Sequence, residues 1–216
     1  MTDWIAAGWP APANIVAGTM LKTHDSKTLP ISATPCWLSQ VHGTKVVAAG
    51  NYAEPPEADA AVSRSPEFAA VVRTADCLPV LLCAADGLVF AAAHAGWRGL
   101  LGGVIENTVA AMEVAPSSLL AWLGPAISQA AFEVGEDVRE AFLSADPESS
   151  RHFETNARGR YQADLYGLAR QRLAKVGVER VYGGGLCTFA DADRFHSYRR
   201  DPDCGRLSSF VGVQTP

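Results

Sequence analysis

Three side chains with metal-ligand character stand at the ends of apolar segments in this sequence: His42, Cys77 and His94. Two imidazoles and one thiolate leave one position of a tetrahedral metal site open, and an open position is typical of catalytic rather than structural zinc. Zinc in such a site lowers the pKa of a bound water toward neutrality. The spacing fits no compact finger motif. The residues alone therefore leave a second interpretation open, a buried thiol with two hydrogen-bonded core histidines.

A predicted β-hairpin brings Cys77 and His94 together. Residues 79–84 and 88–93 are apolar, and Asp86-Gly87 between them favours a tight turn because both residues tolerate positive φ. Pairing across that turn places His94 opposite the residues that begin with Cys77. The thiol and the imidazole are thus expected at one end of one hairpin.

The neighbours of these residues suggest acid–base and anion-binding chemistry. Asp76 directly precedes the thiol and is the nearest candidate base. Arg98 stands in the Gly-rich turn 96–99 before a predicted helix, where backbone N–H groups and a guanidinium form an anion site. Arg98 could equally cap neighbouring carbonyl groups. The aromatic and cationic run 195–200, which contains Arg199 and is followed by Gly205-Arg206, could hold a base and a phosphate or form a solvated turn.

The remaining pattern predicts the scaffold. The longest helix is expected over 99–115, because apolar residues recur there every three or four positions. Shorter helices are expected over 136–144 and from Asp164 to Gly177. Strands outnumber helices and often follow one another directly, which predicts an α/β protein with mixed sheets. The other predicted strands cover 14–21, 36–41, 44–49, 58–62, 68–73, 119–123, 178–182 and 208–213, and irregular chain is expected over 1–13, 22–35 and 146–159.

The composition narrows the possible classes of function. The chain has 216 residues, 48% hydrophobic and 19% charged, which is enough for one sizeable core. Its formal net charge is −5 and it has no basic run, so nucleic-acid binding is not expected. The sequence has no apolar stretch of about 18 residues, so no membrane span is expected. The first residues do not resemble a signal peptide. Five scattered cysteines favour reduced thiols and a cytoplasmic location.

Six motifs occur in one order along the chain, and together they resemble the YfiH family. This family is also labelled the laccase-domain, polyphenol-oxidase or peptidoglycan editing factor family. The match runs from about residue 36 to the end, whereas the N-terminal part is shorter and lacks the family's Gly-Gly-Val-Ser, Asn-Leu-Gly and Asn-Arg motifs. The six motifs are Gln-Val-His-Gly at 40–43, Thr-Ala-Asp-Cys-Leu-Pro-Val at 74–80, His-Ala-Gly-Trp-Arg-Gly at 94–99, Leu-Gly-Pro-Ala-Ile at 123–127, Phe-Glu-Val-Gly at 132–135 and Ser-Tyr-Arg-Arg-Asp at 197–201.

The resemblance implies a four-layer α/β/β/α fold in a single domain over 1–216. It implies a zinc site whose ligands fall on His42, Cys77 and His94, with copper as the second choice of metal. It also implies purine nucleoside phosphorylase activity toward adenosine, inosine and methylthioadenosine, with adenosine deamination as a further activity. The expected partners are therefore purine nucleosides and phosphate, and no oligomeric state is predicted.

Further residues of this sequence receive expected roles beside the implied metal ligands. Cys77, Asp76 and Arg98 are expected to serve catalysis. Gln40, Arg98 and Arg199 are expected to contact nucleoside and phosphate. The familiar zinc-deaminase signature, His-x-Glu with Pro-Cys-x-x-Cys, is absent, so deamination would use a different arrangement of residues.

Other classes of protein stay open at this point. Cys77 and His94 could be the nucleophile and base of a cysteine amidase that edits cell-wall precursors, which requires a thiolate free of metal. Two histidines and a cysteine also suit copper. A laccase, however, needs a further cluster built from His-x-His pairs, and none of the five histidines forms such a pair. A metal-binding or partner-binding module without catalysis explains an open coordination position beside an anion site less well.

Overall fold

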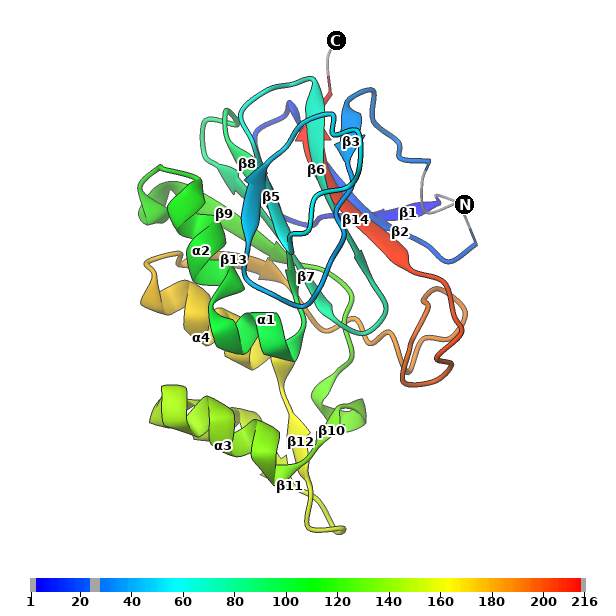
Figure 1. Cartoon of the computed structure of the whole chain (residues 1–216), viewed down its shortest axis with the longest axis vertical. Helices are drawn as coiled ribbons and strands as arrows, with labels where there is room; N and C mark the ends of the chain where they lie inside the picture. The colour runs from blue at the N-terminus through cyan, green and yellow to red at the C-terminus, as the bar shows by residue number, and fades with distance from the viewer. Residues whose placement is uncertain (1–2, 24–27, 215–216) are drawn as a thin grey trace.

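Two β-sheets stacked face to face form the centre of the molecule (Figure 1). The computed structural model describes residues 3–23 and 28–214. Each sheet contains both parallel and antiparallel pairs, so the predicted mixed α/β fold is confirmed. The six-stranded sheet consists, in spatial order, of β13 (Arg180–Gly183), β9 (Leu119–Leu123), β7 (Leu78–Ala84), β8 (Phe90–Ala95), β5 (Ala60–Ser63) and β4 (Val46–Ala48). The five-stranded sheet consists of β1 (Trp4–Ala6), β2 (Ile15–Met20), β14 (Leu207–Val213), β6 (Phe68–Thr74) and β3 (Thr34–Cys36).

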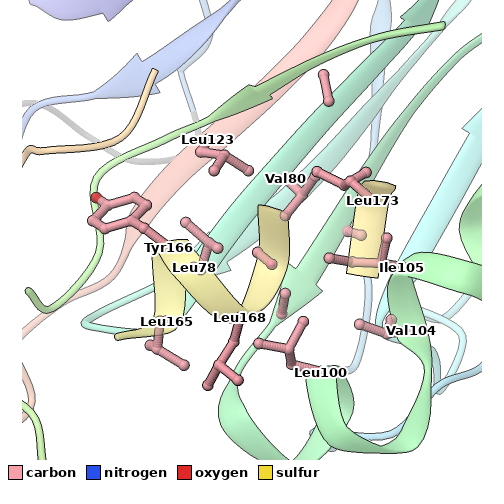
Figure 2. Packing of buried hydrophobic residues seen from close by; sticks show 14 of the residues in the cluster. Leu78, Val80, Leu100, Val104, Ile105, Leu123, Leu165, Tyr166, Leu168 and Leu173 are labelled. Atoms are coloured by element: carbon pink, nitrogen blue, oxygen red, sulfur yellow. The ribbon is translucent and has the colours of Figure 1, made fainter. Parts of the chain in front are cut away.

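Helices cover the outer face of the six-stranded sheet. They are α1 (Trp97–Gly102), α2 (Val104–Ala111) and α4 (Leu165–Lys175). Figure 2 shows side chains from these helices packed onto Leu78, Val80 and Leu123 of the sheet. β7 and β8 are therefore buried on both faces, which explains why their sequences are apolar without alternation.

The opposite outer face, on the five-stranded sheet, is covered differently. Leu29, Ile31 and Trp37 pack there against Val71 and Phe210. Three of the four expected layers are thus present as helix, sheet and sheet. Among the described residues the fourth layer is irregular chain, because the Pro-bounded segment after β2 has no helical pattern.

A small third sheet extends the molecule at the end away from the termini (Figure 1). It contains β10 (Glu133–Val134), β12 (Tyr161–Ala163) and β11 (Phe153–Thr155), and α3 (Glu136–Ala145) lies beside it. The stretch expected to be irregular over 146–159 therefore contains a 3₁₀ helix, Pro147–His152, and a strand. These short elements escape prediction because none spans enough residues to show a period.

The longest predicted helix, over 99–115, is two helices in the structure. α1 and α2 are separated at Gly103, whose φ is 100°. Glycine adopts this left-handed conformation readily, and the Gly103 N–H caps α1 by donating to two carbonyl groups in its last turn. The pair Gly102-Gly103 thus ends one helix and begins the next.

Two predictions in the N-terminal third are also corrected. The stretch 1–13 is not irregular throughout, because β1 pairs with β2 and Trp4 packs on the Phe210 ring. The strand predicted over 36–41 ends at Cys36, and only an isolated bridge at Ser39 follows. The Gln40 side chain takes the place of the missing strand by hydrogen-bonding to the backbone of Arg73.

The other predicted strands and helices are present with small shifts of their ends. Asp164 is the N-cap of α4 as predicted, but its side chain accepts no capping hydrogen bond. The loop predicted over 22–35 includes residues 24–27, which lie outside the described residues. All five cysteines are free thiols. No helix in the described part of the chain is both long and apolar enough to cross a membrane.

Candidate metal and substrate site

The hairpin of β7 and β8 places Cys77 and His94 at one end of the six-stranded sheet. Pro79 pairs with His94, and Cys77 directly precedes β7, so the predicted register is confirmed. His94 is the penultimate residue of β8 and its side chain is buried. The order of residues along two paired strands therefore brings a thiol to an imidazole without help from distant segments.

His42 completes the group from a separate segment, the loop between β3 and β4. Its Nε2 lies 3.8 Å from the Cys77 Sγ, and its ring meets the His94 ring edge-on with 4.7 Å between centroids. The ligand atoms of the three residues all lie within 4.8 Å of one another. His42 has a φ of 61°, an uncommon conformation for a residue with a side chain.

Asp59, directly before β5, fixes both histidines. Its carboxylate accepts a hydrogen bond from His94 Nδ1 at 2.7 Å and from the backbone N–H of His42 at 2.9 Å. It also accepts from the N–H groups of Val41 (3.2 Å) and Gly43 (2.6 Å). The carboxylate thus holds the strained His42 loop in place. It also keeps the proton on His94 Nδ1, which leaves Nε2 free as a metal ligand.

The protonation of the group follows from these contacts. Burial disfavours a Cys77 thiolate, but the hydrogen bonds and charges of His42 and His94 outweigh it and lower the thiol pKa to about 6. Burial likewise disfavours a charged His94, yet Asp59 and Cys77 raise its pKa to about 9. Without a metal the pair is therefore a thiolate beside an imidazolium at neutral pH.

Two glycines of the turn 96–99 let the backbone approach this group closely. A Cβ atom on Gly96 would lie 2.9 Å from the Cys77 Sγ and 3.1 Å from His42 Cδ2. A Cβ atom on Gly99 would lie 2.8 Å from the carbonyl oxygen of Gly43. Both positions require glycine because a side chain would occupy the space of the ligands or of the loop that carries His42.

The donor atoms present fit a zinc ion. One thiolate and two imidazoles converge, one histidine is oriented by a carboxylate, and the set leaves a further position for water or substrate. In the described residues no other group of three or more His, Cys, Asp or Glu side chains comes together in this way.

A cavity of about 600 Å³ opens beside the three ligands. Arg98 lines it, and its guanidinium lies 4.3 Å from the ring centroid of Trp97. Arg98 therefore lines the same cavity as His42, Cys77 and His94. The cavity is lined by Leu38, Ser39, Gln40, His42, Arg73, Thr74, Ala75, Cys77, His94, Arg98, Tyr198 and Arg206.

Gln40 lines the cavity but its amide is already engaged. Its Nε2 donates to the Arg73 carbonyl at 2.8 Å, and its Oε1 accepts from the Arg73 N–H at 2.7 Å. The side chain therefore replaces the strand partner that β6 loses when β3 ends at Cys36. The strand predicted over 36–41 therefore stops early without leaving the backbone N–H and carbonyl of Arg73 unpaired.

Asp76 and Arg199 lie outside the cavity lining. The Asp76 carboxylate accepts hydrogen bonds from the hydroxyls of Thr188 (2.6 Å) and Ser197 (3.0 Å) and from the Arg199 N–H (2.7 Å). The Arg199 guanidinium donates to the carbonyl groups of Ala131 (3.4 Å) and Glu133 (3.2 Å). Both side chains are thus engaged in holding the segment 188–199 against the body of the protein.

The motifs do not indicate Asp59 and Arg73, although Asp59 contacts a metal ligand and Arg73 lines the cavity. Asp59 carries a usable signal, since an acidic residue inside an otherwise apolar strand must be paired. Arg73 ends an apolar strand in the same way. Tyr198 and Arg206 line the cavity and belong to the aromatic and cationic segment near the C-terminus, whose residue types already suggested a site for a base and a phosphate.

A family model and several named relatives match this chain over most of its length. Residues 14–214 match a family model described as multi-copper polyphenol oxidoreductase laccase. The purine nucleoside phosphorylase YfiH of Escherichia coli is 42% identical, over 98% of this chain and 99% of that protein. A purine nucleoside phosphorylase of Pseudomonas aeruginosa is 43% identical, over 99% of this chain and all of that protein. Both alignments are longer than this chain, so these relatives contain residues that it lacks.

Solved structures show the same fold. A protein of Neisseria meningitidis superposes with a TM-score of 0.91 at 40% identity, covering 99% of this chain and all of the other. YlmD of Geobacillus stearothermophilus superposes with a TM-score of 0.87 at 24% identity, covering 99% of this chain and 97% of the other, and supports the fold alone. From the family model and the relatives together, the chain belongs to the YfiH family of laccase-domain proteins.

Proposed function

We propose that this protein is a zinc-dependent purine nucleoside phosphorylase that accepts adenosine, inosine and methylthioadenosine and also deaminates adenosine. The observation that carries the proposal is the convergence of His42, Cys77 and His94 beside a cavity that contains Arg98. The names of the relatives, purine nucleoside phosphorylases at 42% and 43% identity over nearly the whole chain, support it. A cytoplasmic location stays a prediction.

In this proposal His42, Cys77 and His94 hold the metal. Zinc bound there supplies Lewis-acid chemistry that stabilises negative charge developing on the reactants. Asp59 keeps the His94 proton on Nδ1 and fixes the His42 loop, so the ligands are oriented before substrate enters.

Arg98 is the group proposed to bind the attacking phosphate. Its guanidinium presents several donors and lies over the Trp97 ring, which limits its orientations. In phosphorolysis a phosphate oxygen forms a bond to the anomeric carbon of the sugar while the bond from that carbon to the purine nitrogen breaks. The purine leaves with the bonding electrons and takes up a proton.

Asp76, Arg199 and Gln40 receive framework roles in the proposal. Each spends its polar atoms on backbone or hydroxyl partners, and Asp76 and Arg199 do not line the cavity. They position the segments that carry Tyr198 and Arg73. Cys77 and Arg98 keep roles in the site itself. Cys77 serves as a metal ligand, and Arg98 serves as a substrate-binding residue.

A cysteine amidase is the second candidate. The low Cys77 pKa and the neighbouring imidazolium suit a nucleophile and its base when no metal is bound. A multicopper oxidase is disfavoured, because the described residues contain one convergent His-Cys cluster rather than several.

The test combines elemental analysis of the purified protein with a panel of purine nucleosides, each assayed with and without phosphate. The proposal expects about one zinc per chain, base release that requires phosphate, and inosine formation from adenosine that does not. A metal-free protein that forms a covalent adduct at Cys77 and releases no base would favour the amidase instead.

A further inference from the structure

We propose that Arg73 and Arg206 form a second anion subsite in the same cavity and bind a phosphate group there. The proposal deepens the proposed function, and it rests on that function only for the identity of the ligand. The subsite itself follows from the pairing of two strands and from the charges that line the cavity.

The register of the five-stranded sheet brings the two arginines together. Arg73 of β6 pairs with Ser208 of β14, and Thr74 pairs with Leu207. Arg206 directly precedes β14, so continuing this register places it diagonal to Arg73 on the same face of the sheet. Diagonal neighbours lie roughly 7–8 Å apart, within reach of long side chains. Both residues line the cavity and both are exposed.

Neither guanidinium has a carboxylate partner in the part of the chain that the structure describes. The Arg73 side chain makes no hydrogen bond or ion pair there, and only its backbone pairs with Gln40. Arg206 Nη1 donates to the carbonyl groups of Cys204 at 2.9 Å and Gly205 at 3.1 Å, and it lies 3.9 Å from the Cys204 sulfur. These neutral partners do not balance its charge.

The rest of the cavity adds positive charge and no carboxylate. Arg98 is the third arginine in the lining, and the lining contains no Asp or Glu. Three guanidiniums in one cavity repel each other, although the chain as a whole carries a net charge of −5. An anion that enters removes this repulsion, so the cavity is selective for anionic ligands.

Thr74 provides an independent indication beside Arg73. Thr74 is 1% exposed and is one of the residues that line the cavity, and its buried Oγ1 has no hydrogen-bond partner among the described residues. A buried hydroxyl without a partner is unfavourable, and a ligand oxygen would satisfy it. A phosphate group fits this set best, because its oxygens match both the guanidinium forks and a hydroxyl donor.

The phosphate group could be inorganic phosphate or the phosphate of a nucleoside monophosphate. Calorimetric titrations with inorganic phosphate and with adenosine 5′-monophosphate, at an ionic strength fixed with chloride, separate the two. The double variant Arg73→Gln/Arg206→Gln should bind at least one of them roughly tenfold more weakly or worse. Thr74→Val should show a smaller loss. Arg151→Gln, which removes an exposed ion pair with Glu148, is the matched control and should bind like the wild type.

Loss of binding for either ligand in the double variant supports the subsite and names its source of phosphate. Equal binding of both ligands by wild type and double variant overturns it, as does a wild type that binds neither. Thermal melting confirms that the exposed substitutions leave the fold intact. The binding measurement needs no turnover, so the two proposals can fail separately. If phosphate binding depends on the two arginines but the protein releases no base, the proposed function is refuted and the subsite is not. Phosphorolysis by a double variant that binds both ligands as tightly as the wild type would refute the subsite alone.

Discussion

Two partly buried cysteines, Cys77 and Cys187, both have a thiol pKa below the usual value, but for different reasons. At Cys77, burial is outweighed by two imidazoles. At Cys187, burial is outweighed by hydrogen bonds from the Ser128 hydroxyl at 3.0 Å and from the backbone N–H groups of Ser128 and Ala190, each at 3.4 Å. Each thiolate is therefore stabilised, the first by metal ligands and the second by hydrogen-bond donors.

The difference shows that a low thiol pKa does not identify a metal site. Imidazole nitrogens offer lone pairs to a cation, whereas N–H and O–H donors repel one. Cys83 marks the other extreme, because burial in the core raises its pKa to about 12. Cys77 is thus the cysteine whose neighbours suit metal chemistry, and the predictions below compare it with positions that share one of its properties.

The largest effect is expected when each thiol is removed. Cys77→Ala should lose bound zinc and reduce phosphorolysis by at least roughly a hundredfold, since several kcal/mol of transition-state stabilisation goes with the metal. Cys187→Ala should keep both its zinc and its turnover. Metal analysis and steady-state rates on the two variants provide the comparison. A Cys77→Ala protein that keeps zinc and activity would contradict the assignment of the ligand.

The next effect concerns the carboxylate behind the histidines. Asp59→Asn should weaken zinc binding roughly 10–100-fold, because His94 and the His42 loop lose their anionic acceptor. Competition with a chromophoric chelator measures the affinity. Asp146→Asn is the matched control, since Asp146 is also buried and hydrogen-bonded but pairs with Lys175. An Asp59→Asn protein with wild-type zinc affinity would show that Asp59 does not orient the ligands.

A smaller effect is expected from one added methyl group. Gly96→Ala places a Cβ atom within 2.9 Å of the Cys77 Sγ, so the turn or the thiolate must shift and zinc occupancy should fall in part. Gly8→Ala, where no atom lies within 4 Å of the new Cβ, is the control. Zinc content after dialysis against a weak chelator measures the difference. Equal occupancy in the two variants would mean that the turn adapts without cost.

The last comparison leaves the sequence unchanged. It measures how fast each thiol is alkylated at pH 7. In metal-free protein Cys77 and Cys187 should react faster than Cys83, because their lowered pKa values give more thiolate at this pH. Adding zinc should protect Cys77 and leave Cys187 reactive. Mass spectrometry of the modified peptides reads both sites, and zinc protection at Cys187 would contradict the distinction between them.

Local sequence signals predicted much of this site. Asp86-Gly87 between two apolar runs fixes the hairpin register, and the register alone places His94 near Cys77. His42 entered from the family resemblance, since no spacing rule connects a loop after β3 to the end of β8. The pair Gly102-Gly103 indicates a break in the helix, but the apolar period continues across these two residues and conceals the break.

The remaining contacts depend on pairings between distant strands. Arg206 reaches the cavity because β14 pairs with β6, and Gln40 faces Arg73 because β3 ends early. Asp76 stands next to a ligand in sequence, yet its side chain turns to Thr188 and Ser197. Adjacency along the chain therefore predicts a role poorly where the backbone turns, as it does at Asp76 with a φ of 85°.

The most direct test of the link between the His42–Cys77–His94 cluster and phosphorolysis is a metal-restoration assay. Phosphate-dependent release of hypoxanthine from inosine is measured on protein stripped of metal, and again after one equivalent of zinc is returned. Activity should be lost on stripping and recovered with zinc in the wild type, and zinc should restore nothing in Cys77→Ala. Full phosphorolysis by the metal-stripped wild type would contradict the proposed mechanism.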